Sequence, residues 1–197
     1  MIGYLGPEGS FTHLAFIEYS KKHTVSGSTP FQTIAQIIEA VNSGKIKSGM
    51  VPIENSIEGS VGETLDQLIR ASQKVTINAE IIIPIEHCLI TKKKNLNEVT
   101  KVLAHTQALS QCQGYLKRFL PNAVLEPATS NSMAVKIVSE NGDSMAAIGP
   151  KMAAEIYKVP VYEAGINDEK DPLLLYIFAI LAEANFGWRL TKYIRTA

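Results

Sequence analysis

The sequence predicts an α/β fold of two α/β lobes joined by an extended crossover. Short apolar runs alternate with amphipathic helical stretches through most of the 197 residues, a pattern typical of largely parallel sheets with helices on both faces. The alternation stops at 75–91, an extended segment that Pro84 interrupts and that is too long for one ordinary strand. It then restarts. We therefore expect two lobes with a ligand cleft between them.

The first block begins with a strand at 2–5, followed by a Gly-containing turn and a helix at 11–22. A second strand is expected at 25–28, and a third at 49–53. Between them, apolar residues recur at helical spacing and end at Gly44. These residues are Phe31, Ile34, Ile37, Ile38 and Val41. The helix after the third strand is marked by Leu65, Leu68 and Ile69.

The second block repeats the pattern. Strands are expected at 102–104, 123–125, 145–148, 159–164 and 173–181, and helices at 109–120, 132–139 and 151–157. In open α/β sheets, ligands bind beyond the carboxyl ends of the strands. The loops at those ends are therefore the candidate sites.

Composition excludes several classes of function. Lys plus Arg and Asp plus Glu both number 19, so the net charge is zero and nothing favours nucleic acid. The apolar runs are too short to span a bilayer, and no apolar leader precedes the first strand. We therefore expect a cytoplasmic protein rather than a membrane protein or a secreted solute receptor. Cys88 and Cys112 lack CxxC spacing and are expected to be buried free thiols.

Four polar loops fall at the carboxyl ends of predicted strands, at 6–13, 51–60, 105–108 and 128–134. Each combines Gly or small hydroxyl residues with the start of a helix, where free backbone N–H groups and the helix dipole favour anions. Ser and Thr are also ordinary helix caps, so one such loop alone would be weak evidence. The sequence contains no metal-ligand cluster, P-loop or GxGxxG fingerprint. The four loops together predict a small carboxylate or phosphate ligand, with no metal and no cofactor.

The second of these loops, VPIENSIEGS, carries the most ordered set of polar groups. It places Glu54, Asn55, Ser56 and Ser60 at the end of one buried strand. Glu54 is suited to act as a general acid or base, and equally suited to pair with a nearby lysine. The residues alone leave both roles open.

Seven motifs, in their order and spacing, resemble those of prephenate dehydratase. They are GPEGSFTHLA at 6–15, VPIENSIEGSV at 51–61, PIEHCLI at 84–90, AHTQALSQC at 104–112, ATSNSMAV at 128–135, AAIGPKMAAEIY at 146–157 and GINDEKD at 165–171. The resemblance covers about residues 1–171, and the ordered set is far more specific than any one motif. It implies a catalytic part similar to type II periplasmic binding proteins, and the conversion of prephenate to phenylpyruvate in phenylalanine biosynthesis without a cofactor. On this basis we expect residues 1–77 plus 160–182 to form lobe 1, 78–159 to form lobe 2, and 183–197 to be an atypical tail.

The resemblance also implies roles for individual residues. Asn55 and Ser56 would contact the substrate and form the catalytic group with Glu54, which would mainly organise its loop because a bare carboxylate repels a dianion. Further donors would come from Ser10, Thr12 and Ser60 in the first lobe. The second lobe would contribute His105, Gln107, Thr129 and Ser130.

One part of the family pattern is missing. The family follows its IxDxxxN segment with a Thr-Arg-Phe triplet, in which Thr is the proton donor to the leaving hydroxyl and Arg recognises a carboxylate. Here Leu174 and Leu175 stand in the expected place. Because positioned acid catalysis contributes about 10²–10⁴-fold, we expect impaired turnover. Residues 183–197 do not resemble the ACT domain that commonly follows, and an altered reading frame after about Asp171 or a truncated variant would explain both differences.

Two other functions stay open. Arogenate differs from prephenate by one amino group, and no residue of the sequence separates the two substrates. A non-catalytic two-lobed module that binds an aromatic or dicarboxylic acid would keep the cleft without the proton donor. The sequence does not specify an oligomeric state, and the resemblance allows a homodimer.

Overall fold

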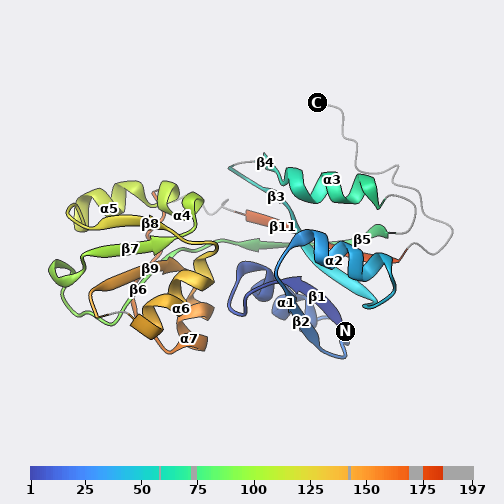
Figure 1. Cartoon of the computed structure of the whole chain (residues 1–197), viewed down its shortest axis with the longest axis horizontal. Coiled ribbons are helices and arrows are strands. Elements are labelled where there is room, and N and C mark those ends of the chain that lie inside the picture. The colour runs from blue at the N-terminus through green and yellow to red at the C-terminus, as the bar shows by residue number, and fades with distance from the viewer. Residues whose placement is uncertain (58, 72–74, 142, 169–174, 184–197) are drawn as a thin grey trace. The chain divides into compact units, whose positions relative to one another are not determined.

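The computed structural model describes residues 1–57, 59–71, 75–141, 143–168 and 175–183, which form two α/β units. The first unit combines Met1–Gly6, the described residues of Thr12–Ile83, and the strand β11 (Leu175–Glu183). The second combines Pro7–Phe11 with the described residues of 84–168. The predicted fold class of two α/β lobes is confirmed, and each unit has its own sheet (Figure 1).

The elements of the first unit are β1 (Ile2–Leu5), α1 (Phe11–Ser20), β2 (Ser28–Phe31), α2 (Ile34–Asn42), β3 (Ser48–Asn55), β4 (Gly59–Ser60), α3 (Gly62–Arg70), β5 (Val75–Pro84) and β11 (Leu175–Glu183). The main path of the sheet runs β2-β1-β3-β11-β5, with β4 paired to β3. Strand β1 is parallel to β2 and β3, whereas β11 runs antiparallel to β3.

Helices cover both faces of this sheet because the residues of β1 and β3 alternate between them. Gly3 and Gly49 are paired, and a Cβ at Gly49 would lie 2.4 Å from Ile37 Cγ2 of α2. The absent side chain therefore lets α2 pack directly on the strand. On the other face Tyr4 is almost completely buried, and its ring stacks on His13 of α1 with the centroids 4.7 Å apart.

The elements of the second unit are β6 (Cys88–Thr91), the 3-10 helix η1 (Leu96–Glu98), β7 (Lys101–Ala104), α4 (Thr106–Gln111), α5 (Gln113–Phe119), β8 (Val124–Pro127), α6 (Asn131–Asn141), β9 (Met145–Gly149), α7 (Lys151–Tyr157) and β10 (Val161–Ala164). The sheet order is β10-β6-β9-β7-β8. Strand β7 is parallel to β8 and β9, and β6 is antiparallel to β9 and β10.

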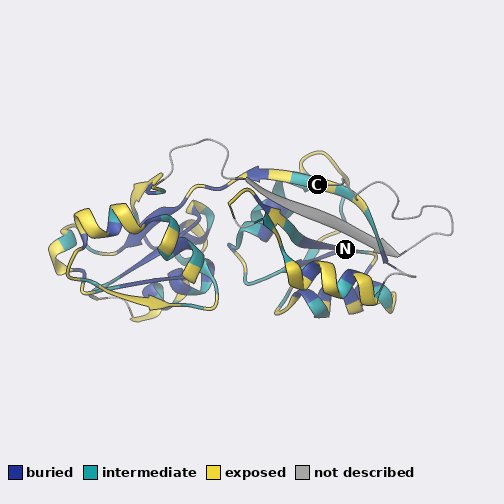
Figure 2. Ribbon diagram, turned by 90° about the horizontal axis from the view of Figure 1, so that it is seen from above, coloured by how far each residue is buried: buried dark blue, intermediate teal, exposed yellow. Residues whose placement is uncertain are grey.

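Both faces of the second sheet are also covered. Leu89, Val102 and Ile148 pack with the helices α4 and α5, whereas Ile90 and Leu103 pack with α6 and α7. Figure 1 shows the two helix pairs on opposite sides of the strands, and Figure 2 shows buried strands with helices exposed on their outer faces. Within the described part of the chain, no helix is long and apolar enough to cross a membrane.

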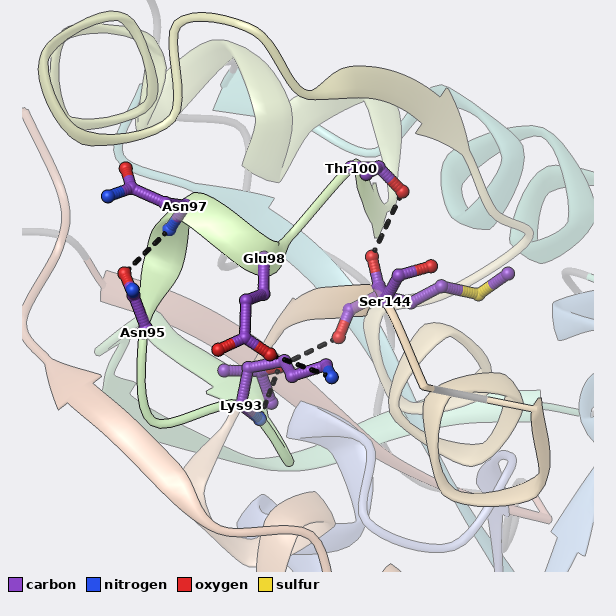
Figure 3. A network of polar contacts seen from close by, with 8 residues as sticks. Lys93, Asn95, Asn97, Glu98, Thr100 and Ser144 are labelled. Atoms are coloured by element: carbon purple, nitrogen blue, oxygen red, sulfur yellow. Dashed lines mark hydrogen bonds and ion pairs between the residues drawn. The ribbon is translucent and has the colours of Figure 1, made fainter.

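A network of polar contacts lies at the amino ends of β7 and β9 (Figure 3). Lys93 Nζ lies 2.9 Å from a Glu98 carboxylate oxygen, and the Thr100 N–H donates to the Ser144 carbonyl over 2.9 Å. At the end of β6, the buried Thr91 hydroxyl donates to the Met145 carbonyl over 2.8 Å. These contacts lie at the end of the sheet opposite to the loops that follow β7 and β8.

Candidate functional site

The ten residues predicted for the site fall in both units. The first unit holds Thr12, Glu54, Asn55, Ser56 and Ser60, and the second holds Ser10, His105, Gln107, Thr129 and Ser130. The division differs from the expected boundaries at three places. Pro7–Phe11 and β10 belong to the second unit, and β5 belongs to the first as far as Ile83.

A tight hairpin gathers the polar residues at the end of β3. Asn55 pairs with Gly59, and Glu54 pairs with Ser60. The Asn55 Oδ1 accepts a hydrogen bond from the Ile57 N–H over 2.8 Å, an Asx-type turn that starts the reversal. Asn55 is buried, whereas Glu54, Ser56 and Ser60 are exposed. The structure therefore brings these four residues together, and the side-chain oxygen of Asn55 helps to form the turn of the hairpin.

The strand β11 begins beside this hairpin. Its residue Tyr176 is opposite Asn55, and Ile177 is opposite Glu54. Leu175, one of the two residues in the place of the family's Thr and Arg, is therefore one residue away from the strand partner of Asn55. Leu174, the other, lies outside the described residues, as does the tail at 184–197. Thr12, in the first turn of α1, is buried.

Ser10 is held by the second unit through its neighbours. The Glu8 carbonyl accepts hydrogen bonds from the Ser132 hydroxyl and, over 3.2 Å, from the Tyr157 hydroxyl. Gly9 has φ +79°, and a Cβ there would lie 2.9 Å from the Ala153 Cα. Glycine therefore lets this loop approach α6 and α7, so Ser10 is grouped with the second unit rather than with Ser60.

The loops after β7 and β8 lie side by side. The His105 N–H donates to Asn131 Oδ1 over 2.8 Å, which links the two loops directly. The His105 Nδ1 accepts from the Gln107 N–H over 3.4 Å at the start of α4, and the Ser130 Oγ accepts from the Met133 N–H over 3.1 Å at the start of α6. In this structure His105 and Ser130 cap helices, and Thr129 is exposed next to them.

Three polar residues of the second unit that contact one another were not singled out from the sequence. His87 is 2% exposed, and its Nε2 lies 2.9 Å from Gln111 Oε1. The His87 N–H donates to Asn167 Oδ1 over 3.0 Å. Burial lowers the pKa of His87 below its ordinary value, and the hydrogen bond with Gln111 opposes this only in part. A neutral imidazole is therefore expected at neutral pH.

The sequence contained only weak indications that these three residues are important. His87 is a polar residue directly before an apolar strand, and Gln111 follows Gln107 by four residues on one helix. Asn167 stands in the GINDEKD motif. All three occur in motifs used for the resemblance, but their mutual contacts span 24 and 80 residues of sequence, which no local pattern reveals.

The chemistry available in these loops is that of hydrogen-bond donors. Cys88 and Cys112 are buried free thiols, as predicted, and burial raises the pKa of Cys88 to about 11 and that of Cys112 to about 12. Neither thiol is therefore a nucleophile at neutral pH. Over the described ranges, no group of three or more His, Cys, Asp or Glu is arranged to hold a metal ion. Amide, hydroxyl and backbone N–H groups remain, which suit an anionic or hydroxylated ligand.

Comparison with known proteins agrees with the motif order. The sequence profile of the family described as "Prephenate dehydratase" matches residues 2–176. A bifunctional chorismate mutase/prephenate dehydratase of Neisseria gonorrhoeae is 38% identical over 170 residues, which are 85% of this chain and 46% of that protein. A prephenate dehydratase of Bacillus subtilis is 33% identical over 177 residues, 86% of this chain and 60% of that protein. The chain thus spans only about half the length of these curated relatives.

Solved structures agree with the fold. The prephenate dehydratase of Arthrobacter aurescens in complex with L-Phe matches with a TM-score of 0.79 and 28% identity, covering 93% of this chain and 60% of that one. A periplasmic substrate-binding protein of an ABC transporter from Coxiella burnetii matches with a TM-score of 0.52 at 12% identity, over 92% of this chain and 83% of that one, which shows likeness of fold alone. The predicted similarity to periplasmic binding proteins is confirmed at that level. With the family profile matched over residues 2–176, the chain belongs to the prephenate dehydratase family.

Proposed function

We propose that this chain converts prephenate to phenylpyruvate. In this reaction the bond between the ring and its carboxylate breaks and releases carbon dioxide. The electron pair moves into the ring, and the hydroxyl on the opposite ring carbon leaves as water after it receives a proton. Aromaticity drives the step, so the protein has to bind a dianion, favour departure of the hydroxyl and exclude water. The observation that carries the proposal is the match of the family profile across 2–176, which includes both sets of polar loops.

The proposed roles follow the chemistry of each loop. Asn55 and Ser56 contact the substrate from the hairpin after β3, and the neighbouring Ser60 supplies a further hydroxyl. Glu54 is proposed to organise the hairpin, in which its backbone pairs with that of Ser60. From the second unit, Ser10, Gln107 and Thr129 supply further donors, while His105 and Ser130 act mainly by holding the helix starts on which those donors stand. Thr12, in the first turn of α1, is proposed to supply a further hydroxyl to the substrate.

Turnover is proposed to be slow. Leucine at 174 and 175 can neither donate a proton to the leaving hydroxyl nor pair with a carboxylate. The absence of a positioned acid lowers the rate by about 10²–10⁴-fold. Water or one of the hydroxyl groups of the loops would then supply the proton.

The first experiment measures phenylpyruvate formation by the unaltered chain, Asn55→Ala and Ser56→Ala. Each variant should lower kcat/KM by about tenfold or more, because each removes a hydrogen bond to a charged substrate. Ser43→Ala is the matched control in the same unit, since the Ser43 hydroxyl donates to the Glu39 and Ala40 carbonyls of α2 and, in the part of the chain that the structure describes, to no other group. Folded variants with unchanged turnover would refute the assignment of Asn55 and Ser56.

A second candidate function is a binding module without catalysis, which the leucines at 174 and 175 favour. Calorimetry with prephenate, run beside the turnover assay, separates the two functions: saturable binding with no product supports the module. Arogenate offered in the same assays tests the related dehydratase activity. Faster turnover of arogenate than of prephenate would replace the proposed substrate.

A further inference from the structure

The strongest unexplained feature of the molecule is the polar cluster of His87, which is buried, with Gln111 and Asn167, which are half-buried. All three residues belong to the second unit. The backbone fixes their neighbourhood: the Ile166 N–H donates to the His87 carbonyl over 3.0 Å, and the Asp168 N–H donates to the Gln111 carbonyl over 2.8 Å. Segment 166–168 therefore ties the residue before β6 to the end of α4.

The hydrogen bonds within the cluster engage the side-chain oxygen atoms of Gln111 and Asn167 but not their side-chain nitrogen atoms. Gln111 Oε1 is engaged by His87 Nε2, and Asn167 Oδ1 by the His87 N–H. The buried atoms His87 Nδ1, Gln111 Nε2 and Asn167 Nδ2 have no hydrogen-bond partner among the residues that the structure describes. Buried polar groups nearly always have a partner, so three such atoms in one cluster require an explanation.

These bonds also determine which proton His87 carries. With the Gln111 carboxamide oriented as in this structure, its oxygen only accepts, so the imidazole donates to Gln111 Oε1 from Nε2. The neutral ring then has its lone pair on Nδ1. The ring is held by Phe11, whose ring meets it edge-on with the centroids 5.6 Å apart. Phe11 directly follows Ser10, so the cluster lies next to a loop of the candidate site.

We propose that His87 is a positioning residue. By donating from Nε2 to Gln111 Oε1, it fixes the orientation of the Gln111 carboxamide and presents Gln111 Nε2 as a neutral donor to an oxygen atom of the ligand. Asn167 holds the backbone of His87 and thereby its ring. This inference rests on the proposed function, because the oxygen is taken to belong to prephenate.

The fixed orientation is what gives His87 its effect. A glutamine amide that is free to rotate presents its oxygen as readily as its nitrogen, and the oxygen would repel an anionic ligand. A hydrogen bond donated by His87 Nε2 fixes the orientation of the amide, because rotating the amide would place the Gln111 N–H against the His87 N–H. In a low-dielectric interior an oriented donor binds an anion more strongly than the same group in water.

The test compares His87→Leu, His87→Gln and Thr91→Val in the full chain. His87→Leu removes the donor, whereas His87→Gln retains an N–H that can reach Gln111. Thr91→Val is the matched control, because it removes two hydrogen bonds, one to the Met145 carbonyl and one from the Lys93 N–H, at the end of β6 away from His87. We expect His87→Leu to lower kcat/KM for prephenate by about 10- to 100-fold and His87→Gln to restore most of it. Thr91→Val should lower the Tm without a comparable kinetic loss.

Nitrogen-15 NMR provides a readout that does not depend on turnover. The unaltered chain at pH 7.5 should show neutral His87 with its proton on Nε2. The Gln111 side-chain amide signals should move on addition of prephenate, and they should differ in His87→Leu but not in Thr91→Val. Equal kinetic losses in His87→Leu and Thr91→Val, a proton on Nδ1, or Gln111 signals indifferent to bound prephenate would each overturn the inference. If the unaltered chain neither binds nor converts prephenate, the proposed function fails, and the His87 proton and the His87→Leu spectrum decide the positioning role alone.

Discussion

Asp168 fastens segment 166–168 to the second unit, and its replacement by alanine tests how much that attachment contributes to stability. Its carboxylate accepts hydrogen bonds from the Gly114 N–H over 2.8 Å and the Tyr115 N–H over 3.1 Å. Both donors lie in the first turn of α5, where backbone N–H groups have no partner within the helix. The side chain therefore acts as a helix cap supplied by a distant part of the chain.

The expected loss follows from values for helix caps. Removal of a capping side chain costs about 0.5–2 kcal/mol, and the exposure of Asp168 and Gly114 lets water replace part of the interaction. We expect Asp168→Ala to lower the free energy of unfolding by about 1–2 kcal/mol. For a chain of this size, that corresponds to a fall in Tm of roughly 2–8 °C. Asp168→Asn keeps a carbonyl acceptor and should lose about half as much.

Calorimetry and hydrogen exchange together check this expectation. Asp168→Ala should speed exchange of the Gly114 and Tyr115 amides as well as lower the Tm. Glu140→Ala is the control, because it removes an exposed carboxylate whose only described ion pair, with Lys136, is long at 3.9 Å. If Asp168→Ala unfolds at the temperature of the unaltered chain, or Glu140→Ala loses as much, the capping argument is refuted.

Two other predictions concern the same unit. Burial lowers the pKa of His87 below the 6.5 of an exposed histidine, so the unfolded chain takes up this proton first as the pH falls. The contribution of neutral His87 to stability is therefore present above about pH 6.5 and declines below it. The Tm should accordingly fall more between pH 7.5 and 5.5 in the unaltered chain than in His87→Gln. Gly9→Ala combines a left-handed backbone conformation with a Cβ 2.9 Å from Ala153 Cα, and should cost about 2–4 kcal/mol in urea unfolding; an alanine variant as stable as the unaltered chain would show that the loop can leave α7 freely.

The regular elements could be predicted because their physical signal is local. Apolar residues at strand and helix periods located nearly every strand and helix to within a few residues, and the helix at 151–157 has the predicted bounds. The prediction of largely parallel pairing is confirmed for β1–β3 and for β7–β9. Strands β6, β10 and β11 run antiparallel to their described neighbours. Strands β6 and β11 are the first after the chain changes unit, and β10 is the last described strand before such a change.

The break between α4 and α5 could not be predicted from the neighbouring residues. The apolar spacing predicted one helix at 109–120, whereas the structure has two helices that meet at Cys112. The second begins with Gly114 and Tyr115 bound to Asp168, which is more than 50 residues away in sequence. A helix start capped by a distant side chain leaves no signature in the neighbouring residues. The pairing of His87 with Gln111 escaped prediction for the same reason.

The start of β11 allows a last prediction, in which function is gained rather than lost. Tyr176 pairs with Asn55, so Leu175, the residue before it in the strand, adjoins the hairpin that carries Glu54 and Ser56. The double substitution Leu174→Thr with Leu175→Arg would supply a proton donor and a guanidinium at the two positions where the family has them. If the reaction is limited by protonation of the leaving hydroxyl, kcat for phenylpyruvate formation should rise by about 10²–10⁴-fold. Leu175→Arg alone should lower KM with little change in kcat, because a charge that binds ground state and transition state alike leaves the barrier between them unaltered. If the double variant folds and binds prephenate but forms phenylpyruvate no faster than the unaltered chain does, the missing triplet is not what limits the turnover of this protein.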